Sequence, residues 1–408
     1  MKGKMWRKIG VWGISLSLLA GAMPVSTNAR VCMQQGTVEG QTAATQKRKA
    51  VAEKKGTITL NGDDIRADNV NGLTYKGFGV LSANSTSDLL MDYKAQNPEA
   101  YAQLLTYLFG GKYPIMTHVK LEMGNDRDNS TGAEASTKRT KTEKANVLRN
   151  PGWQLAADAK KINPKVKVSI LRWNAPKWVN SMEDVYQWYK ESILAAYEQY
   201  GYMVDYINPN VNEGWNKKTD VDYTKKFAAW IAAEDEKSIP DEKARKLFHN
   251  IKLIVSDEAI RLSADIADTM KTDQDFYNAV DVVGYHYNTN DDKNDGMKWL
   301  ADEQDKEVWN SEAQAVFSNS AFRPANNVKD PSVEGTGLGG TGSALEMGNT
   351  FIKGFVKSRR THVVYQPAIG SFYEGGQFSF KELVSARDPW SGWIHYDAGL
   401  LVLAHLSK

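Results

Sequence analysis

Short apolar runs and amphipathic segments alternate along the chain from about residue 57 onward. Each apolar run has the length of a buried strand, and apolar residues at helical spacing follow it. The predicted strands are residues 76–82, 118–124, 166–173, 204–214 with its exit loop, 251–259, 281–287, 307–313 and 362–374. Eight strand–helix units are what a closed barrel needs. We therefore predict an α/β fold of the (β/α)8 TIM-barrel type, although a doubly wound open sheet would alternate in the same way.

Capping residues mark two of the predicted helices. Asn97 precedes Pro98, the arrangement of an N-cap followed by proline at the first helical position. Ser181 and Asp184 have the spacing of a capping box ahead of a second helix. The first helix also carries an apolar face formed by Tyr101, Leu104, Leu105 and Leu108. Both helices therefore have a defined start, and the first also has a face for packing.

The N-terminal segment has the features of a secretory signal peptide. The basic stretch "MKGKMWRK" precedes the apolar "IGVWGISLSLLAGAM", and small residues lead up to Ala29. We expect a signal peptide over 1–29, a flexible linker over 30–55 and a catalytic domain over 56–408, with an uncleaved anchor as the alternative. We predict that residues 57–65 form a short β segment that belongs to an accessory β-sandwich. The protein is then secreted or cell-surface associated by bacterial-type export, without stable membrane insertion after cleavage.

Composition is that of a globular protein with no strong charge. The 408 residues are 41% hydrophobic and 25% charged, with a net charge of +2, so no nucleic-acid partner is expected. The single cysteine, Cys32, excludes an internal disulfide. The 12 Trp and 18 Tyr residues serve either for core packing or for stacking on sugars. We expect a monomer.

Two glutamates lie where predicted strands end. Asn212 and Glu213 follow the fourth strand, and Glu312 closes the seventh. In a (β/α)8 barrel the carboxyl ends of all strands meet at one mouth, and strands four and seven face each other across it. Hydrolysis of a glycoside needs two carboxyl groups on opposite sides of a sugar, one protonated and one ionised. The pair is therefore the main candidate for catalysis.

Other polar and aromatic residues reach the same predicted mouth. His286 and Tyr287 end the sixth strand, and Trp173 ends the third. His286 is placed to hold a sugar hydroxyl or a carboxylate rather than a metal, with a structural hydrogen bond as the alternative. Further carboxylates near strand ends, expected to have supporting roles, are Glu122, Glu258 and Glu374.

Several stretches give the chain a specific resemblance. They include "YKGFGVLSANSTSDLLMDY", "LRWNAPKW", "VDYINPNVNEGW", "WNSEA" and "SARDPWSGW". From about residue 57 to the end, the chain resembles the galactocerebrosidase family, glycoside hydrolase family 59, among the clan A barrel hydrolases. The resemblance implies a retaining β-glycosidase that acts on terminal β-galactosides of a glycan or glycolipid, without a metal or organic cofactor.

The resemblance also implies residue roles. Glu213 corresponds to the acid/base and Glu312 to the nucleophile, while Asn212 would bind the sugar 2-hydroxyl. The residues expected to contact the substrate are Asn212, Trp173, His286, Ser130, Thr131 and Tyr287.

Some positions depart from the family pattern. "GAEAS" replaces a Gly-Thr-Glu-Pro-Ser-His type of run, and Phe378 stands where an active-site tyrosine would fall. The chain ends at Lys408, where the family continues into a β-sandwich. Three alternatives remain: another clan A β-glycosidase, of endo-galactanase or β-xylosidase type; an inactive carbohydrate-binding protein; or a truncated product of low stability.

Overall fold

The structure is a computed structural model that describes residues 71–83, 86–127, 133–259, 263–286, 295–313, 344–366, 369–371, 383–386 and 388–408. The predicted signal peptide over 1–29, the linker over 30–55 and the β segment over 57–65 lie outside these residues, so they remain predictions.

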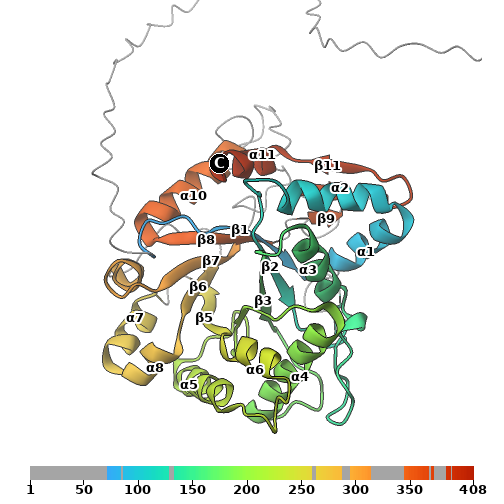
Figure 1. Cartoon of the computed structure of the whole chain (residues 1–408). Coiled ribbons are helices and arrows are strands. Elements are labelled where there is room, and N and C mark those ends of the chain that lie inside the picture. The colour runs from blue at the N-terminus through green and yellow to red at the C-terminus, as the bar shows by residue number, and fades with distance from the viewer. Residues whose placement is uncertain are drawn as a thin grey trace, which may run out of the picture. The chain divides into compact units, whose positions relative to one another are not determined.

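Eight parallel strands close into a barrel in chain order, which confirms the predicted (β/α)8 fold (Figure 1). Parallel pairing of β1 with β8, with Gly79 opposite Val364, closes the barrel, and this closure excludes the open-sheet alternative. The strands are β1 Gly77–Ser82, β2 His118–Glu122, β3 Lys167–Leu171, β4 Tyr206–Ile207, β5 Lys252–Ala259, β6 Val282–His286, β7 Glu307–Ala313 and β8 Arg360–Tyr365.

Helices surround the barrel strands (Figure 1). The two predicted caps are present, since the Asn97 side chain accepts a bond from the Ala100 amide and that of Ser181 from the Asp184 amide. Among the helices of the described ranges, none has the length and apolar character that a membrane crossing requires. The helices are α1 Thr86–Gln96, α2 Pro98–Phe109, α3 Pro151–Ile162, α4 Met182–Tyr200, α5 Lys217–Ala233, α6 Glu242–His249, α7 Ser263–Thr272, α8 Gln274–Ala279, α9 Gly296–Lys298, α10 Ala344–Ser358 and α11 Ala398–Leu406.

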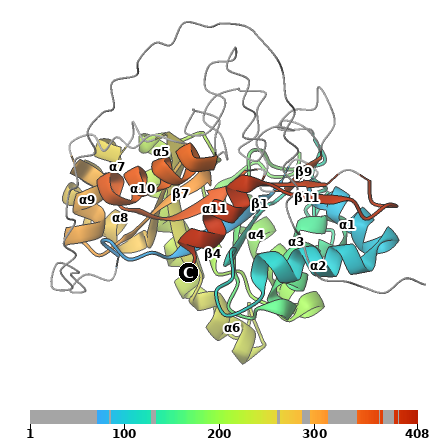
Figure 2. The ribbon, with the colours of Figure 1, turned by 90° about the horizontal axis from the view of Figure 1, so that it is seen from above.

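A second, three-stranded sheet was not predicted. It consists of β9 Ile369–Ser371, β10 Val384–Ala386 and β11 Ile394–Tyr396, so the strand predicted over 362–374 is divided between β8 and β9. The small sheet lies beside α1 and α2 (Figure 2). The Tyr107 ring of α2 packs 4.8 Å from the Tyr396 ring of β11.

Strand β4 takes up only a small part of the segment 204–214, which was predicted as a strand with its exit loop. It covers only Tyr206–Ile207, because Pro209 has no amide hydrogen to donate to the sheet. The Asn210 amide bonds instead to the Asn208 side chain at 2.9 Å, which turns the chain out of the strand. Glu213 therefore lies in the loop between β4 and α5, within the strand and exit loop predicted over 204–214.

Polar side chains line the inside of the barrel at β2. His118 and Lys120 point inward, where they contact His362 of β8 and Asp257 of β5. Val119 and Leu121, between them, belong to the apolar core outside the barrel. Because strand residues alternate between the two faces, the inner face carries the polar set here, and it leads toward the mouth of the barrel.

Candidate active site

The loop after β4 holds Glu213 in a fixed position. The Asn212 amide donates to the Arg172 carbonyl at 2.8 Å, and the Glu213 amide donates to the Asp257 carbonyl at 2.9 Å. Glu213 itself has a φ of 59°, in the left-handed region that non-glycine residues rarely adopt. Two backbone bonds, to the ends of β3 and to β5, therefore hold a strained residue at the mouth.

Glu312 meets this loop from β7. The Asn212 side-chain amide lies 3.4 Å from Glu312 Oε2. The Glu312 side chain is only 2% exposed, whereas that of Glu213 is 40% exposed. The predicted pair is thus brought together, with one carboxyl group enclosed by protein and the other open to the surface.

His286 bridges the two glutamates. It ends β6 and pairs in register with Glu312 of β7. Its Nδ1 atom lies 3.3 Å from Glu213 Oε1 and 3.7 Å from Glu312 Oε2. Its Nε2 atom faces Asp257 Oδ1 at 3.3 Å. The imidazole ring therefore contacts carboxylates at both nitrogens.

Asp257 and Lys120 complete the site, and sequence reasoning missed both. Ser256 and Asp257 have positive φ values of 78° and 42°, in a bulge of β5 that turns Asp257 into the barrel. Lys120 Nζ lies 3.0 Å from Asp257 Oδ1, and the side-chain amide of Asn208 donates to Asp257 Oδ2 at 2.9 Å. Together with His286, these two residues hold the Asp257 carboxylate from three directions.

These contacts set the charge of the two central groups. Burial lowers the pKa of His286, but the charge of Glu312 and the hydrogen bonds to Asp257 and Glu213 outweigh it and raise the pKa to about 9. Burial of Asp257 raises its pKa, but the charge of Lys120 and the bond to His286 hold it well below its ordinary value. At neutral pH the site therefore contains a charged imidazolium beside an ionised aspartate.

The other predicted residues lie at the mouth or outside the described residues. Trp173 is half-buried and packs against an apolar group formed by Leu81, Ala83, Leu171 and Val364, from the ends of β1, β3 and β8. Ser130, Thr131 and Tyr287 lie outside the described residues, as does Glu374. Glu122 is buried in β2 and Glu258 lies in β5.

Glu213, His286 and Glu312 also bring one donor atom each within 4.8 Å of one another, a spacing that could hold a metal ion. A histidine must be neutral to bind a metal. Because the surrounding carboxylates raise the pKa of His286 to about 9, a proton competes for that position at neutral pH. We therefore do not assign a metal site here.

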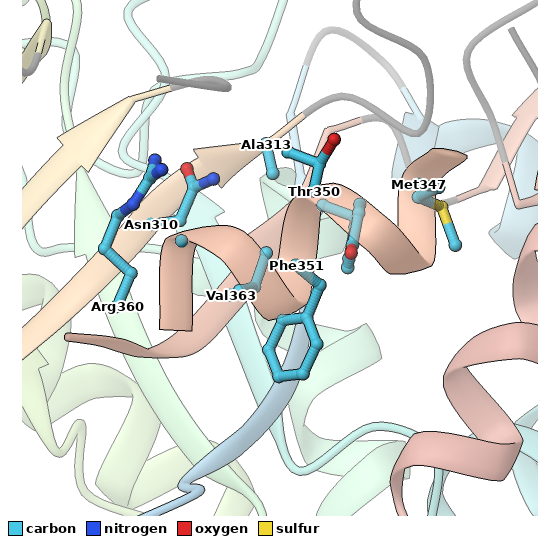
Figure 3. Close-up of a pocket in the computed structure, with 9 residues that line it drawn as sticks. Asn310, Ala313, Met347, Thr350, Phe351, Arg360 and Val363 are labelled. Atoms are coloured by element: carbon cyan, nitrogen blue, oxygen red, sulfur yellow. The ribbon is translucent and has the colours of Figure 1, made fainter. Parts of the chain in front are cut away.

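A separate small pocket lies outside the barrel wall, between β7, β8 and α10 (Figure 3). Asn310 and Arg360 line its strand side, while Thr350 and Phe351 come from α10. Its free volume of about 20 Å³ holds a single water molecule. This pocket is too small for a sugar, and neither Glu213 nor Glu312 lines it.

A closed (β/α)8 barrel with one glutamate after β4 and another on β7 is the arrangement expected of a barrel glycoside hydrolase. Comparison with known proteins agrees with this class. The chain belongs to glycosyl hydrolase family 59, whose sequence profile matches residues 75–408.

Curated proteins that are similar to this chain include galactocerebrosidases. That of Danio rerio is 26% identical over 353 residues, which cover 83% of this chain and 45% of the relative. The Homo sapiens protein is 27% identical over 349 residues, which cover 83% of this chain and 44% of the relative. The Mus musculus protein is 24% identical over 404 residues, with 96% and 51% covered. The chain thus spans about half the length of the curated relatives it matches.

Solved structures share the fold at low identity. SrfJ from Salmonella typhimurium matches with a TM-score of 0.61 and 15% identity, over 82% of this chain and 74% of the other. The endo-β1,6-glucanase BT3312 matches with a TM-score of 0.59 and 17% identity, over 83% and 76%. These likenesses concern the fold alone.

Proposed function

We propose that this chain is a retaining β-glycosidase that removes terminal β-galactosyl groups by double displacement. The observation that carries the proposal is the close approach of the two carboxyl groups, since one oxygen of Glu213 and one of Glu312 lie within 4.8 Å of each other. Retaining enzymes keep the two carboxyl groups about 5–5.5 Å apart, and inverting enzymes about 6.5–9.5 Å apart. This close approach supports the shorter, retaining range over the longer, inverting one.

In the first step, Glu312 attacks the anomeric carbon while the bond to the leaving oxygen breaks. Glu213 gives its proton to that oxygen, and a covalent glycosyl-enzyme forms. In the second step, water attacks the same carbon and gives a proton back to Glu213, while the bond to Glu312 breaks. Each step leaves the enzyme with the protonation state that the next one needs.

The burial of the two residues supports these roles. Glu312 is enclosed, so a nucleophile there is protected from bulk water. Glu213 is partly open, so leaving groups and incoming water can reach it. Asn212, already beside Glu312, is the residue we propose to bind the sugar 2-hydroxyl, where a bond that strengthens in the transition state lowers the barrier.

The proposed sugar follows from the relatives, which are named galactocerebrosidases. Trp173 offers a half-buried ring at the mouth, suited to stack on the apolar face of a sugar. Ser130, Thr131 and Tyr287 remain proposed contacts. The substrate is proposed to be a β-linked glycan or glycolipid, met outside the cytoplasm if residues 1–29 act as a signal peptide.

The test is hydrolysis of a panel of aryl β-glycosides by the full chain. We expect turnover of the galactoside and a loss on the order of 10⁴-fold or more in Glu312→Gln, because the nucleophile is removed. The matched control is Glu307→Gln, at the opposite end of the same strand, where the side chain accepts a bond from Trp309. That variant should keep its activity.

Product stereochemistry decides the mechanism. Proton NMR of the first product should show the β-anomer, whereas an α-anomer would contradict double displacement. Turnover of a different sugar would correct the substrate while keeping the enzyme class. A folded protein that turns over no sugar would contradict the proposal and favour a carbohydrate-binding role.

A further inference from the structure

A buried ion pair lies directly below the catalytic carboxylates. Lys120 of β2 and Asp257 of β5 meet at 3.0 Å, and their side chains are 1% and 0% exposed. A buried ion pair is a poor source of stability, because desolvation of both charges offsets their attraction. Its place in the barrel interior, beneath the proposed site, points to a role in that site.

The pair is connected to both catalytic strands. Lys120 Nζ also donates to the carbonyl of Ser311 at 3.1 Å, the residue just before Glu312. Asp257 Oδ1 faces Nε2 of His286 at 3.3 Å. One end of the pair thus touches the strand of the nucleophile, and the other touches the imidazole that bridges the two glutamates.

The barrel leaves space for this arrangement at Gly284. A Cβ atom added there would lie 2.6 Å from Ser311 Oγ and 3.0 Å from Asp257 Oδ1. Gly284 lies two residues before His286 on β6, so a side chain at this position would point toward the same inner face of the barrel. The absence of a side chain allows the aspartate to reach both Lys120 and His286.

We propose that Lys120 and Asp257 are positioning residues that act through His286. Asp257 accepts the Nε2 hydrogen, which turns Nδ1 toward Glu213 and Glu312. Lys120 keeps Asp257 ionised and in place. The inference rests on the proposed glycosidase function. It adds the Lys120–Asp257 pair to the proposed site as the group that sets the charge of His286.

The balance of charges explains the use of such a pair. His286 is faced by Glu213 from the loop after β4, by Asp257 from β5 and by Glu312 from β7. Lys120 and His286 thus place two cations among these three carboxylates.

The test is the pH dependence of kcat/KM in Lys120→Met, with the full chain and an aryl β-galactoside. Removal of a buried cation makes every nearby acid harder to deprotonate. We expect kcat/KM to fall on the order of 10- to 100-fold. Both limbs of the pH profile should move to higher pH, by roughly half a unit or more. A merely structural loss would lower the profile without moving it.

The matched control is Lys138→Met. Lys138 is also buried, at 2% exposed, and pairs with Glu191 of α4. Its variant should keep both limbs at their wild-type positions. A folded Lys120→Met protein whose limbs coincide with those of the wild type would overturn the proposal.

A second measurement does not depend on activity. Nitrogen-15 spectra of histidine-labelled wild-type protein at neutral pH should show both ring nitrogens of His286 protonated, with His286→Gln identifying the signal. A singly protonated ring would overturn the proposal. If the wild type hydrolyses no glycoside while the ring is doubly protonated, the proposed function fails and the charge arrangement stands.

Discussion

At position 213 the backbone and the chemistry have opposite requirements. The left-handed conformation, with φ at 59°, favours glycine, whereas the proposed acid/base role needs a carboxyl group. Non-glycine residues adopt this conformation at a cost of about 1–2 kcal/mol. The hydrogen bonds that the backbone N–H groups of Asn212 and Glu213 donate to Arg172 and Asp257 offset that cost. Strain at a reactive residue is a common feature of functional sites.

This strain gives a prediction about stability. Glu213→Gly and Glu213→Ala should both lose activity, but the glycine variant should unfold at a higher temperature by roughly 1–3 °C. Glycine removes the left-handed penalty, and alanine keeps it. Thermal unfolding followed by circular dichroism compares the two directly. An alanine variant as stable as the glycine variant would show that the loop relaxes and that position 213 is not strained.

At the scale of single elements, the sequence predicted some strands well and others poorly. Glu312 and His286 were found because apolar runs end at these residues. The inward Lys120 was missed, although the alternation of His118, Lys120 and Glu122 with apolar neighbours carries the signal. In a barrel covered by helices, the polar face of such a strand is the interior, not the solvent face.

The bulge in β5 shows what alternation cannot predict. In "VSDEA" a regular strand would place either Asp257 or Glu258 inward, but not both. The register shift between Ser256 and Glu258 and the two positive φ values change the alternation locally. Sequence periodicity therefore could not identify Asp257 as the partner of His286. Similarly, the small sheet β9–β11 consists of three-residue strands, too short to show any period.

Helix α11 offers a test of how the last element is held. Leu403 is fully buried in the core, whereas Leu401 of the same helix is 47% exposed. Leu403→Ala should lower the free energy of unfolding by about 2–5 kcal/mol because it opens a cavity. Leu401→Ala, the matched control, should change it by less than about 0.5 kcal/mol. Urea unfolding measures both, and equal losses would contradict the packing of α11.

On the scale of the whole barrel, two uncharged histidines occupy the inner layer below the Lys120–Asp257 pair. His118 Nδ1 lies 2.8 Å from His362 Nε2, and both rings pack near Trp309. Burial lowers the pKa of His118 well below its ordinary value, with the neighbouring His362 as the next cause. Burial also lowers the pKa of His362, to about 4. The layer is therefore neutral at the pH where the site above it is charged.

This layer predicts a loss of stability in acid. The unfolded chain binds protons at these histidines below its ordinary pKa of about 6.5, and the folded protein does not. Stability should therefore be complete above pH 6.5 and fall between about 6.5 and 4, by about 3 kcal/mol for His362 alone. The His362→Gln variant should be less stable than the wild type at pH 7.5. Between pH 6.5 and 4, however, it should lose less stability than the wild type does. Melting temperatures across pH measure the effect.

The control for this experiment is His249→Gln, at the exposed end of α6, where the ring contacts the Glu234 carbonyl. Its melting temperature should follow the wild-type slope. If His362→Gln keeps the same slope as the wild type, the acid loss comes from other groups and the neutral layer is not its cause.

The pairing of the first strand with the last has a consequence for biosynthesis. β1 lies at Gly77–Ser82, and its partner β8 begins only at Arg360, about 280 residues later. At a translation rate of roughly 5–20 residues per second, β1 waits roughly 15–60 s before its second neighbour is made. During that time the incomplete barrel exposes an unpaired strand edge, which is prone to aggregation. Folding yield should therefore depend on whatever shields that edge while the chain is still growing.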